Sequence, residues 1–209
     1  MVTIIKITSI KMNKIKEILI GTSNIGKYRE ICTLLPKEIK KYSLKEFKIS
    51  SPEEKGKSFK ENSLIKASYY CKKTNLICLA DDSGLEIDLL NGAPGIYSSR
   101  WAGENNNFDF AINKVFKEME KIKENWINYN KANFICCLTI YWPSGKNFSG
   151  EGIINGKISP RKKGKRGFGY DPIFIPEGYN KTFGEMKSKL KMSIDHRYKA
   201  FRKVKKFFF

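Results

Sequence analysis

The sequence predicts an α/β fold in which helices flank a mixed β-sheet. Two patterns support this prediction. In the first half of the chain, short apolar runs of strand length alternate with segments whose apolar residues recur at helical spacing. In the second half, a turn separates two neighbouring strand candidates, which predicts an antiparallel hairpin. A chain of 209 residues suits one domain that contains both kinds of strand pairing.

A strand, a turn and a helix are predicted at the start of this alternation. The apolar run Glu17 to Gly21 has strand length, and the turn Thr22 to Lys27 follows it. Apolar residues at helical spacing then predict a helix from Tyr28 to Leu35. Pro36 ends this helix, because proline disfavours helical backbone in the residue before it.

A second helix and two further strands are predicted next. Ser58-Phe-Lys-Glu61 is a capping-box pattern, and the helix that it opens continues to about Lys73. The continuous apolar run Asn75 to Ala80 predicts a strand buried on both faces. We expect Asp81 to Gly84 to form a polar loop at its end, and Leu85 to Leu90 to form another strand.

The second half of the chain contains a long helix and the hairpin. Apolar residues repeat at helical spacing from Phe108 to Ile122, which predicts an amphipathic helix. Phe134 to Trp142 and a strand that ends near Ile154 predict the antiparallel pair. A last helix is expected from about Ile194.

The charge of the chain raises the question of nucleic-acid binding. Forty Lys and Arg against 21 Asp and Glu give a net charge of +19. The excess is mostly lysine and is spread along the chain with many asparagines, so compositional bias plus an anion-binding pocket is favoured over a nucleic-acid surface. There is no run of 18 apolar residues, so we expect no membrane span.

The cysteines and the N-terminal segment bear on location and domain limits. The five cysteines are odd in number and form no C-x-x-C pair, which disfavours zinc and disulfides and favours a reducing, cytoplasmic compartment. Residues 1–16 are basic and free of acidic residues but lack an apolar core and a cleavage site. We expect an N-terminal extension there, followed by a single catalytic domain over residues 17–209.

Two segments have the composition of a phosphate site and a metal site. Gly21 to Lys27 fits most of the pattern G-x-x-x-x-G-K, although Tyr28 replaces the hydroxyl residue that should follow. Free amides and Lys27 at a helix start attract phosphate, but an ordinary capped helix has the same sequence. Asp81-Asp82 repel each other and need either a divalent cation or a solvated turn, and Glu53-Glu54 could supply a further carboxylate.

Two other segments have the composition of a base pocket. The basic loop from Arg161 ends in Phe168-Gly-Tyr-Asp171, which offers an aromatic surface and polar groups for a purine. A solvated loop or a nucleic-acid contact has the same composition. His196 is the only histidine and precedes Arg197; it is either structural or part of a hydrogen-bonding pair for a base or phosphate.

Taken in order, six segments resemble the inosine triphosphate pyrophosphatase family, and the match extends from Ile18 to Ala200. Each segment is weak alone, but the ordered set is specific. The segments are Thr22-Ser-Asn-Ile-Gly-Lys27, Phe59-Lys-Glu-Asn62 with Lys66-Ala67, Ala80-Asp-Asp-Ser-Gly-Leu85, Gly92-Ala-Pro-Gly-Ile-Tyr-Ser-Ser-Arg100, Gly167-Phe-Gly-Tyr-Asp-Pro-Ile-Phe174 and His196-Arg197.

The resemblance implies two lobes with a nucleotide cleft between them, a homodimer, and hydrolysis of ITP, dITP and XTP to a monophosphate and pyrophosphate. It implies Mg²⁺ as cofactor, with Mn²⁺ as a substitute. Asp82 is the expected general base and metal ligand, with Glu53 as the other ligand and Glu54 as the alternative. The expected substrate-binding residues are Thr22, Ser23, Asn24, Ile25, Gly26, Lys27 and Lys66 for the triphosphate, Ser83 for phosphate or sugar, and Phe168, Gly169, Tyr170, Asp171, Lys191, His196 and Arg197 for the base.

One position departs from the family pattern. Asp195 stands where the family usually has serine before the His-Arg pair. This carboxylate could form a salt bridge with Arg197 and weaken base discrimination, or it could point to solvent. The competing functions are a pyrophosphatase for other modified nucleotides and, from another class, a basic nucleic-acid-binding module in which the acidic turn is structural.

Overall fold

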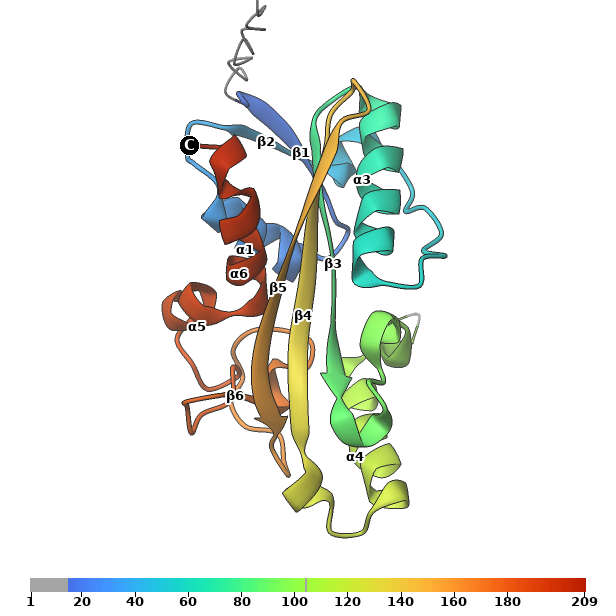
Figure 1. Ribbon diagram of the computed structural model, residues 1–209, viewed down its shortest axis with the longest axis vertical. Coiled ribbons are helices and arrows are strands. Elements are labelled where there is room, and N and C mark those ends of the chain that lie inside the picture. The colour runs from blue at the N-terminus through green and yellow to red at the C-terminus, as the bar shows by residue number, and fades with distance from the viewer. Residues whose placement is uncertain (1–14, 104) are drawn as a thin grey trace, which may run out of the picture.

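The computed structural model describes residues 15–103 and 105–209 and contains one six-stranded mixed sheet of order β2-β1-β3-β4-β5-β6 (Figure 1). The expected N-terminal extension lies outside the described residues up to position 14. β1 (Glu17–Gly21) pairs in parallel with β2 (Lys40–Ser43) and with β3 (Cys78–Ile87). The other pairs are antiparallel and involve β4 (Lys131–Tyr141), β5 (Asn147–Ile158) and β6 (Phe174–Pro176). The predicted α/β class, mixed sheet and hairpin are therefore confirmed.

Helices cover both faces of the sheet. At the end that holds β1 and β2, α3 (Phe59–Thr74) packs on one face, and α1 (Ile25–Leu34) and α6 (His196–Val204) pack on the other (Figure 1). At the opposite end, α4 (Phe108–Ile122) covers the face below α3. The short helices α2 (Leu44–Phe47) and α5 (Ser188–Ile194) complete the set.

The apolar cores define two lobes that share their central strands. The lobe of α1, α3 and α6 has a core on each face of the sheet, because neighbouring residues such as Ile18 and Leu19 point to opposite sides. The lobe of α4 has one large core, which includes Leu85 of β3 and Phe134 of β4. β3, β4 and β5 run through both lobes (Figure 1).

The segment from Asp81 to Gly84 was predicted as a loop, and this prediction is wrong. β3 continues through it, and all ten of its residues pair with β4 from Cys78 opposite Tyr141 to Ile87 opposite Ala132. Polar residues fit inside this strand because their partners come from distant elements, which local composition does not reveal.

Helix boundaries also differ from the prediction, for reasons of capping. The first helix begins at Ile25 because the Asn24 side chain accepts a hydrogen bond from the Lys27 amide at 3.1 Å. The last helix begins at His196 and not at Ile194, because Asp195 caps it. β2, α2 and α5 were not predicted; each is seven residues or shorter.

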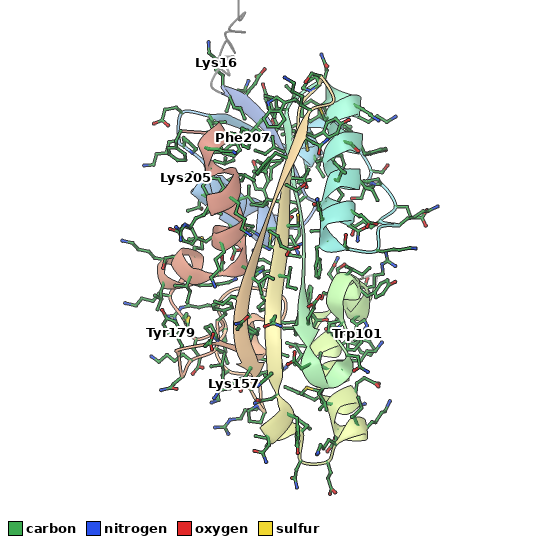
Figure 2. The ribbon with its side chains drawn as sticks, in the orientation of Figure 1. Lys16, Trp101, Lys157, Tyr179, Lys205 and Phe207 are labelled. Atoms are coloured by element: carbon green, nitrogen blue, oxygen red, sulfur yellow. The ribbon has the colours of Figure 1, made fainter. Side chains whose placement is uncertain are left out.

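Exposed basic side chains occur at both ends of the molecule. In Figure 2, the exposed residues Lys16, Lys157 and Lys205 lie at the upper end, in the lower part and at the upper side of the molecule. Within residues 15–103 and 105–209, the helices are too short or too polar to cross a membrane.

Candidate functional site

The turn between β1 and α1 is organised around Asn24 and Lys27. Thr22 Oγ1 accepts a hydrogen bond from the Asn24 amide at 3.3 Å, and Asn24 caps the helix. The Lys27 ammonium lies 3.1 Å from Asp81 Oδ2, with only 18% of its side chain exposed. Lys27 is therefore held toward the sheet, at the positive end of the α1 dipole.

The two adjacent aspartates of β3 lie on opposite faces of the sheet, because side chains alternate along a strand. Asp81 faces α1 and α6, where Lys27 and Arg197 approach it at 3.1 and 3.6 Å. Asp82 faces α3, where Lys66 Nζ donates to its Oδ1 at 2.8 Å. Each carboxylate thus has its own cation, and the pair does not require one shared ion.

The charges around these aspartates shift their pKa values in opposite directions. Burial raises the pKa of Asp81, but the opposite effect of Lys27, Arg197 and Lys66 is larger, so this pKa lies well below its usual range. Burial raises the pKa of Asp82, and the Lys66 ammonium only partly offsets this. Asp82 therefore has the stronger proton affinity of the two, as a general base requires.

Asp82 and Glu54 offer oxygen atoms suited to a divalent cation. Lys66 Nζ lies 3.0 Å from Glu54 Oε1 and so brings this carboxylate to Asp82. Asp82 Oδ2 is buried and accepts no hydrogen bond from the described residues. Within residues 15–103 and 105–209, no three acidic, histidine or cysteine side chains group as a metal site. One or two carboxylates completed by water and phosphate oxygens are the usual surroundings of Mg²⁺.

Glu53, the expected second metal ligand, points elsewhere. Its side chain is 74% exposed and lies 3.0 Å from Lys55, whereas the Glu54 side chain is 28% exposed. The backbone fixes this difference: Arg100 donates to the Glu54 carbonyl at 2.7 Å, and the Gly56 amide donates to Asn62 Oδ1 at 2.8 Å. The geometry therefore favours the alternative, Glu54.

The tip of the basic loop is tied to α5 by ionic hydrogen bonds. Asp171 Oδ2 accepts from the Phe168 amide at 2.9 Å and from Lys191 Nζ at 2.6 Å. Lys191 also donates to Glu30 of α1 at 2.8 Å and lies 4.7 Å from the centre of the Phe168 ring. The loop, α1 and α5 are thereby joined in one network.

The His-Arg pair at the start of α6 is buried against this network. Arg197 donates to Glu30 through Nη1 and to Ser83 Oγ at 3.1 Å through Nη2. His196 stacks on Phe134 with ring centres 4.8 Å apart. Burial, together with Arg197, Lys191 and Lys27, holds the pKa of His196 well below its usual range, so the imidazole is neutral.

Glu30 is a site residue that the sequence analysis did not find. Burial raises the pKa of Glu30, but the opposite effect of Arg197 and Lys191 is larger, so the carboxylate stays ionised. Its spacing from Lys27 places both side chains on one face of α1, and this was the signal that could have revealed it.

Most predicted substrate-binding residues surround one cavity of about 60 Å³ between the lobes, next to a hollow of about 710 Å³. Ser23, Ile25 and Gly26 line the hollow. Phe168 packs on Gly26, where an added Cβ would lie 2.6 Å from the ring. Thr22 and Lys66 line neither space. The cavity is lined by the predicted residues Asn24, Lys27, Ser83, Phe168, Gly169, Tyr170, Asp171, Lys191, His196 and Arg197.

Asp195 takes neither of the two expected positions. It is only 1% exposed, so it does not point to solvent, and among the described residues it forms no salt bridge with Arg197. Its Oδ1 accepts a hydrogen bond from the Tyr198 amide at 2.8 Å and caps α6.

Comparisons with known proteins agree with this architecture. The model of the Ham1 family matches residues 18–207. A dITP/XTP pyrophosphatase of Zymomonas mobilis is 40% identical over 90% of this chain and 89% of its own, and one of Bacillus cereus is 40% identical over 92% and 95%. The Ham1 protein of Staphylococcus aureus superposes with a TM-score of 0.80 at 34% identity, over 92% of this chain and 97% of its own. The HAM1 protein of Coxiella burnetii gives 0.81 at 36%, over 91% and 96%. With the family model covering nearly the whole described chain, this protein belongs to the Ham1 family.

Proposed function

We propose that this protein hydrolyses purine nucleoside triphosphates that carry hypoxanthine or xanthine, such as ITP, dITP and XTP, to the monophosphate and pyrophosphate. The relatives named dITP/XTP pyrophosphatase, at 40% identity over about nine tenths of the chain, support the reaction. The observation that carries the proposal is the cavity in which ten predicted substrate-binding residues converge.

The carboxylates on the α3 side of the sheet are the proposed reaction centre. Asp82 and Glu54 would hold Mg²⁺, or Mn²⁺ in its place, and the ion would neutralise triphosphate charge. Asp82 Oδ2, buried and free of hydrogen bonds from the described residues, accepts a proton from a water molecule. The resulting hydroxide attacks the α-phosphorus, and pyrophosphate leaves with the electrons of the broken P–O bond.

The cations around β1 and β3 are the proposed phosphate ligands. Lys27 at the start of α1 and Lys66 on α3 approach the two faces of β3 at Asp81 and Asp82. Fixed ammonium groups of this kind stabilise charge that develops on phosphate oxygens. Thr22, Ser23, Asn24, Ile25 and Gly26 supply the turn around them.

Base selectivity is proposed to arise at the start of α6. Neutral His196 has one N–H donor, and the Arg197 guanidinium carries several. A 6-oxo group accepts such hydrogen bonds, whereas the 6-amino group of adenine offers a donor and leaves the buried donors unpaired. Phe168 supplies the aromatic surface, and Ser83, Gly169, Tyr170, Asp171 and Lys191 complete the pocket.

The test is the release of pyrophosphate and of orthophosphate from ITP, XTP, GTP and ATP, with Mg²⁺ and with a chelator. We expect pyrophosphate from ITP and XTP only when Mg²⁺ is present, with little from GTP and ATP. Orthophosphate as the first product would contradict the reaction. Turnover of a different modified nucleotide alone would support the alternative pyrophosphatase.

We further propose that residues 17–209 act as one catalytic domain in a cytoplasmic homodimer. The strands shared between the lobes support a single domain, and the five free cysteines support a reducing compartment. The dimer rests on the family resemblance. Light scattering coupled to gel filtration should give about twice the mass of the 24.1 kDa chain, and a monomer mass would contradict it.

A further inference from the structure

Asp195 is buried at the start of the helix that carries the proposed base-reading pair. It is the residue before His196 and caps the helix on which His196 and Arg197 stand. Its amide donates to the Lys191 carbonyl at 3.0 Å, so it joins α5 to α6. Its Oδ2 is buried and has no hydrogen-bond partner among the described residues. Its charge is therefore poorly screened by solvent.

In the network of ion pairs next to Asp195, the positive and negative charges are equal in number without Asp195. Three cations and three carboxylates pair in it, and His196 is neutral. The cations are Lys27, Lys191 and Arg197, and the carboxylates are Glu30, Asp81 and Asp171. An ionised Asp195 adds a fourth carboxylate, which a serine at this position would not.

The groups that face Asp195 come from three helices. Glu30 lies on α1, Lys191 on α5 and Arg197 on α6. Burial first, and then Glu30, raise the pKa of Asp195 to about 6, against the opposite effect of Arg197 and Lys191. The carboxyl is neutral below this pH and an anion above it, so the extra negative charge is present at neutral pH.

The two proposed base classes differ in charge under the same conditions. Hypoxanthine is neutral near pH 7, whereas the second oxo group of xanthine acidifies a ring N–H, so that xanthine is partly an anion. We infer that Asp195 determines selectivity within the proposed function: its buried carboxylate disfavours the xanthine anion and biases the site toward hypoxanthine nucleotides.

The inference is tested by kcat/KM for ITP and XTP over a range of pH in the native protein, Asp195→Asn and Asp195→Ser. Asparagine has the same shape and caps helices well, and serine is the residue usual in the family. The XTP-to-ITP ratio of each protein cancels effects on the shared chemistry. Dividing the variant's ratio by the native ratio at each pH isolates the effect of the substitution, which requires both an ionised Asp195 in the native protein and an ionised xanthine.

We expect both variants to raise the ratio of kcat/KM for XTP to that for ITP by about tenfold near pH 8. This is the size of effect expected when one buried charge that repels an anion is removed. The increase should shrink toward about pH 5, where Asp195 is protonated in the native protein and xanthine is itself less ionised. A loss of structure alone would lower both substrates' kcat/KM without this pH course.

Two results would overturn the inference, and they differ from each other. If both nucleotides are hydrolysed and the ratio follows the same pH course in all three proteins, Asp195 has no role in selectivity and the proposed function stands. If the native protein hydrolyses neither nucleotide, the proposed function fails and the inference fails with it.

Discussion

Asp81 and Asp82 are identical neighbours that β3 sends to opposite faces of the sheet. Each keeps one buried oxygen without a hydrogen bond from the described residues, but Lys27 and Arg197 at Asp81 Oδ2 help hold the pKa of Asp81 low, whereas burial leaves the pKa of Asp82 raised beside Lys66. A structural ion pair and a proposed general base therefore follow each other in the chain. The strand period of two separates their roles.

Replacing Asp82 with asparagine should reduce kcat by about 10²- to 10⁴-fold, the usual contribution of a general base, while the protein stays folded. Pyrophosphate release and thermal unfolding are the measurements. Asp88→Asn, at an exposed aspartate just beyond the end of β3, is the matched control and should keep native activity. Native kcat in the Asp82 variant would remove Asp82 from the mechanism.

The two neighbouring glutamates before α3 provide a second matched pair. Glu54→Gln should raise the Mg²⁺ concentration for half-maximal activity by about tenfold or more, because it removes a charged oxygen ligand. Glu53→Gln should leave it unchanged, since Glu53 is bonded to Lys55 in solvent. A Mg²⁺ titration of activity checks both, and the reverse result would restore Glu53 as the ligand.

Sequence patterns located most of the site but not its pairings. The ordered motifs predicted Lys27 and the His196–Arg197 pair, which line the cavity, and Asp82, which lies on the α3 side of the sheet beside Lys66. The motifs did not predict Glu30, and they did not decide between Glu53 and Glu54 as the metal ligand. The spacing of Glu30 from Lys27 indicates that the two side chains share a face of α1, but it does not indicate the distant Arg197 that Glu30 meets. Which of the two adjacent glutamates turns inward depends on contacts made from Arg100 and Asn62.

At the scale of elements, α6 lies directly on β5 because Gly152 has no side chain. An added Cβ there would collide with the Ala200 amide and the His196 carbonyl. The glycine thus allows the helix that carries His196 and Arg197 to approach the sheet. The position of the base-reading pair depends on this close contact.

Gly152→Ala should lower the free energy of unfolding by about 1–3 kcal/mol, as overpacking in a core does. It should also raise KM for ITP more than it lowers kcat, because it displaces α6 and not Asp82. Urea unfolding and steady-state kinetics measure the two effects. Glu151→Ala, at the exposed neighbouring position of β5, is the control; equal effects of both substitutions would contradict the role of the contact.

Elements with strong local patterns were predicted well, and elements held by distant partners were not. The helix Phe108–Ile122 has the predicted bounds, and the hairpin strands differ only at their ends. β3 was divided in two because Asp81 and Asp82 look like a turn. Their cations come from α1, α3 and α6, so only the tertiary structure makes an acidic strand stable there.

At the scale of the whole molecule, buried ion pairs tie the lobes together and should make the protein sensitive to acid. The folded-state pKa values of Glu30 and Asp81 lie below their ordinary values of 4.5 and 3.8. Their stabilising contribution is therefore complete above those values and is lost as the pH falls through the folded-state pKa values.

We expect the free energy of unfolding, measured in urea at a series of pH values, to fall steeply below about pH 4.5. Protonated Glu30 and Asp81 would leave Arg197 and Lys27 buried without partners. Glu30→Gln should be less stable by about 3–5 kcal/mol at neutral pH, as when a buried pair loses one member, and should lose less on acidification. Parallel pH curves for the two proteins would contradict this account.

The continuity of β3, β4 and β5 through both lobes also limits how this protein can be divided or recombined. A boundary placed between the lobes would cut three hydrogen-bonded strands at once, so neither half could be transferred alone by gene fusion. The exposed hairpin turn near Gly145 lies between β4 and β5, so split-reporter or permuted versions can open the chain there without cutting these strands. The two lobes and the site between them can therefore be transferred to another protein only together.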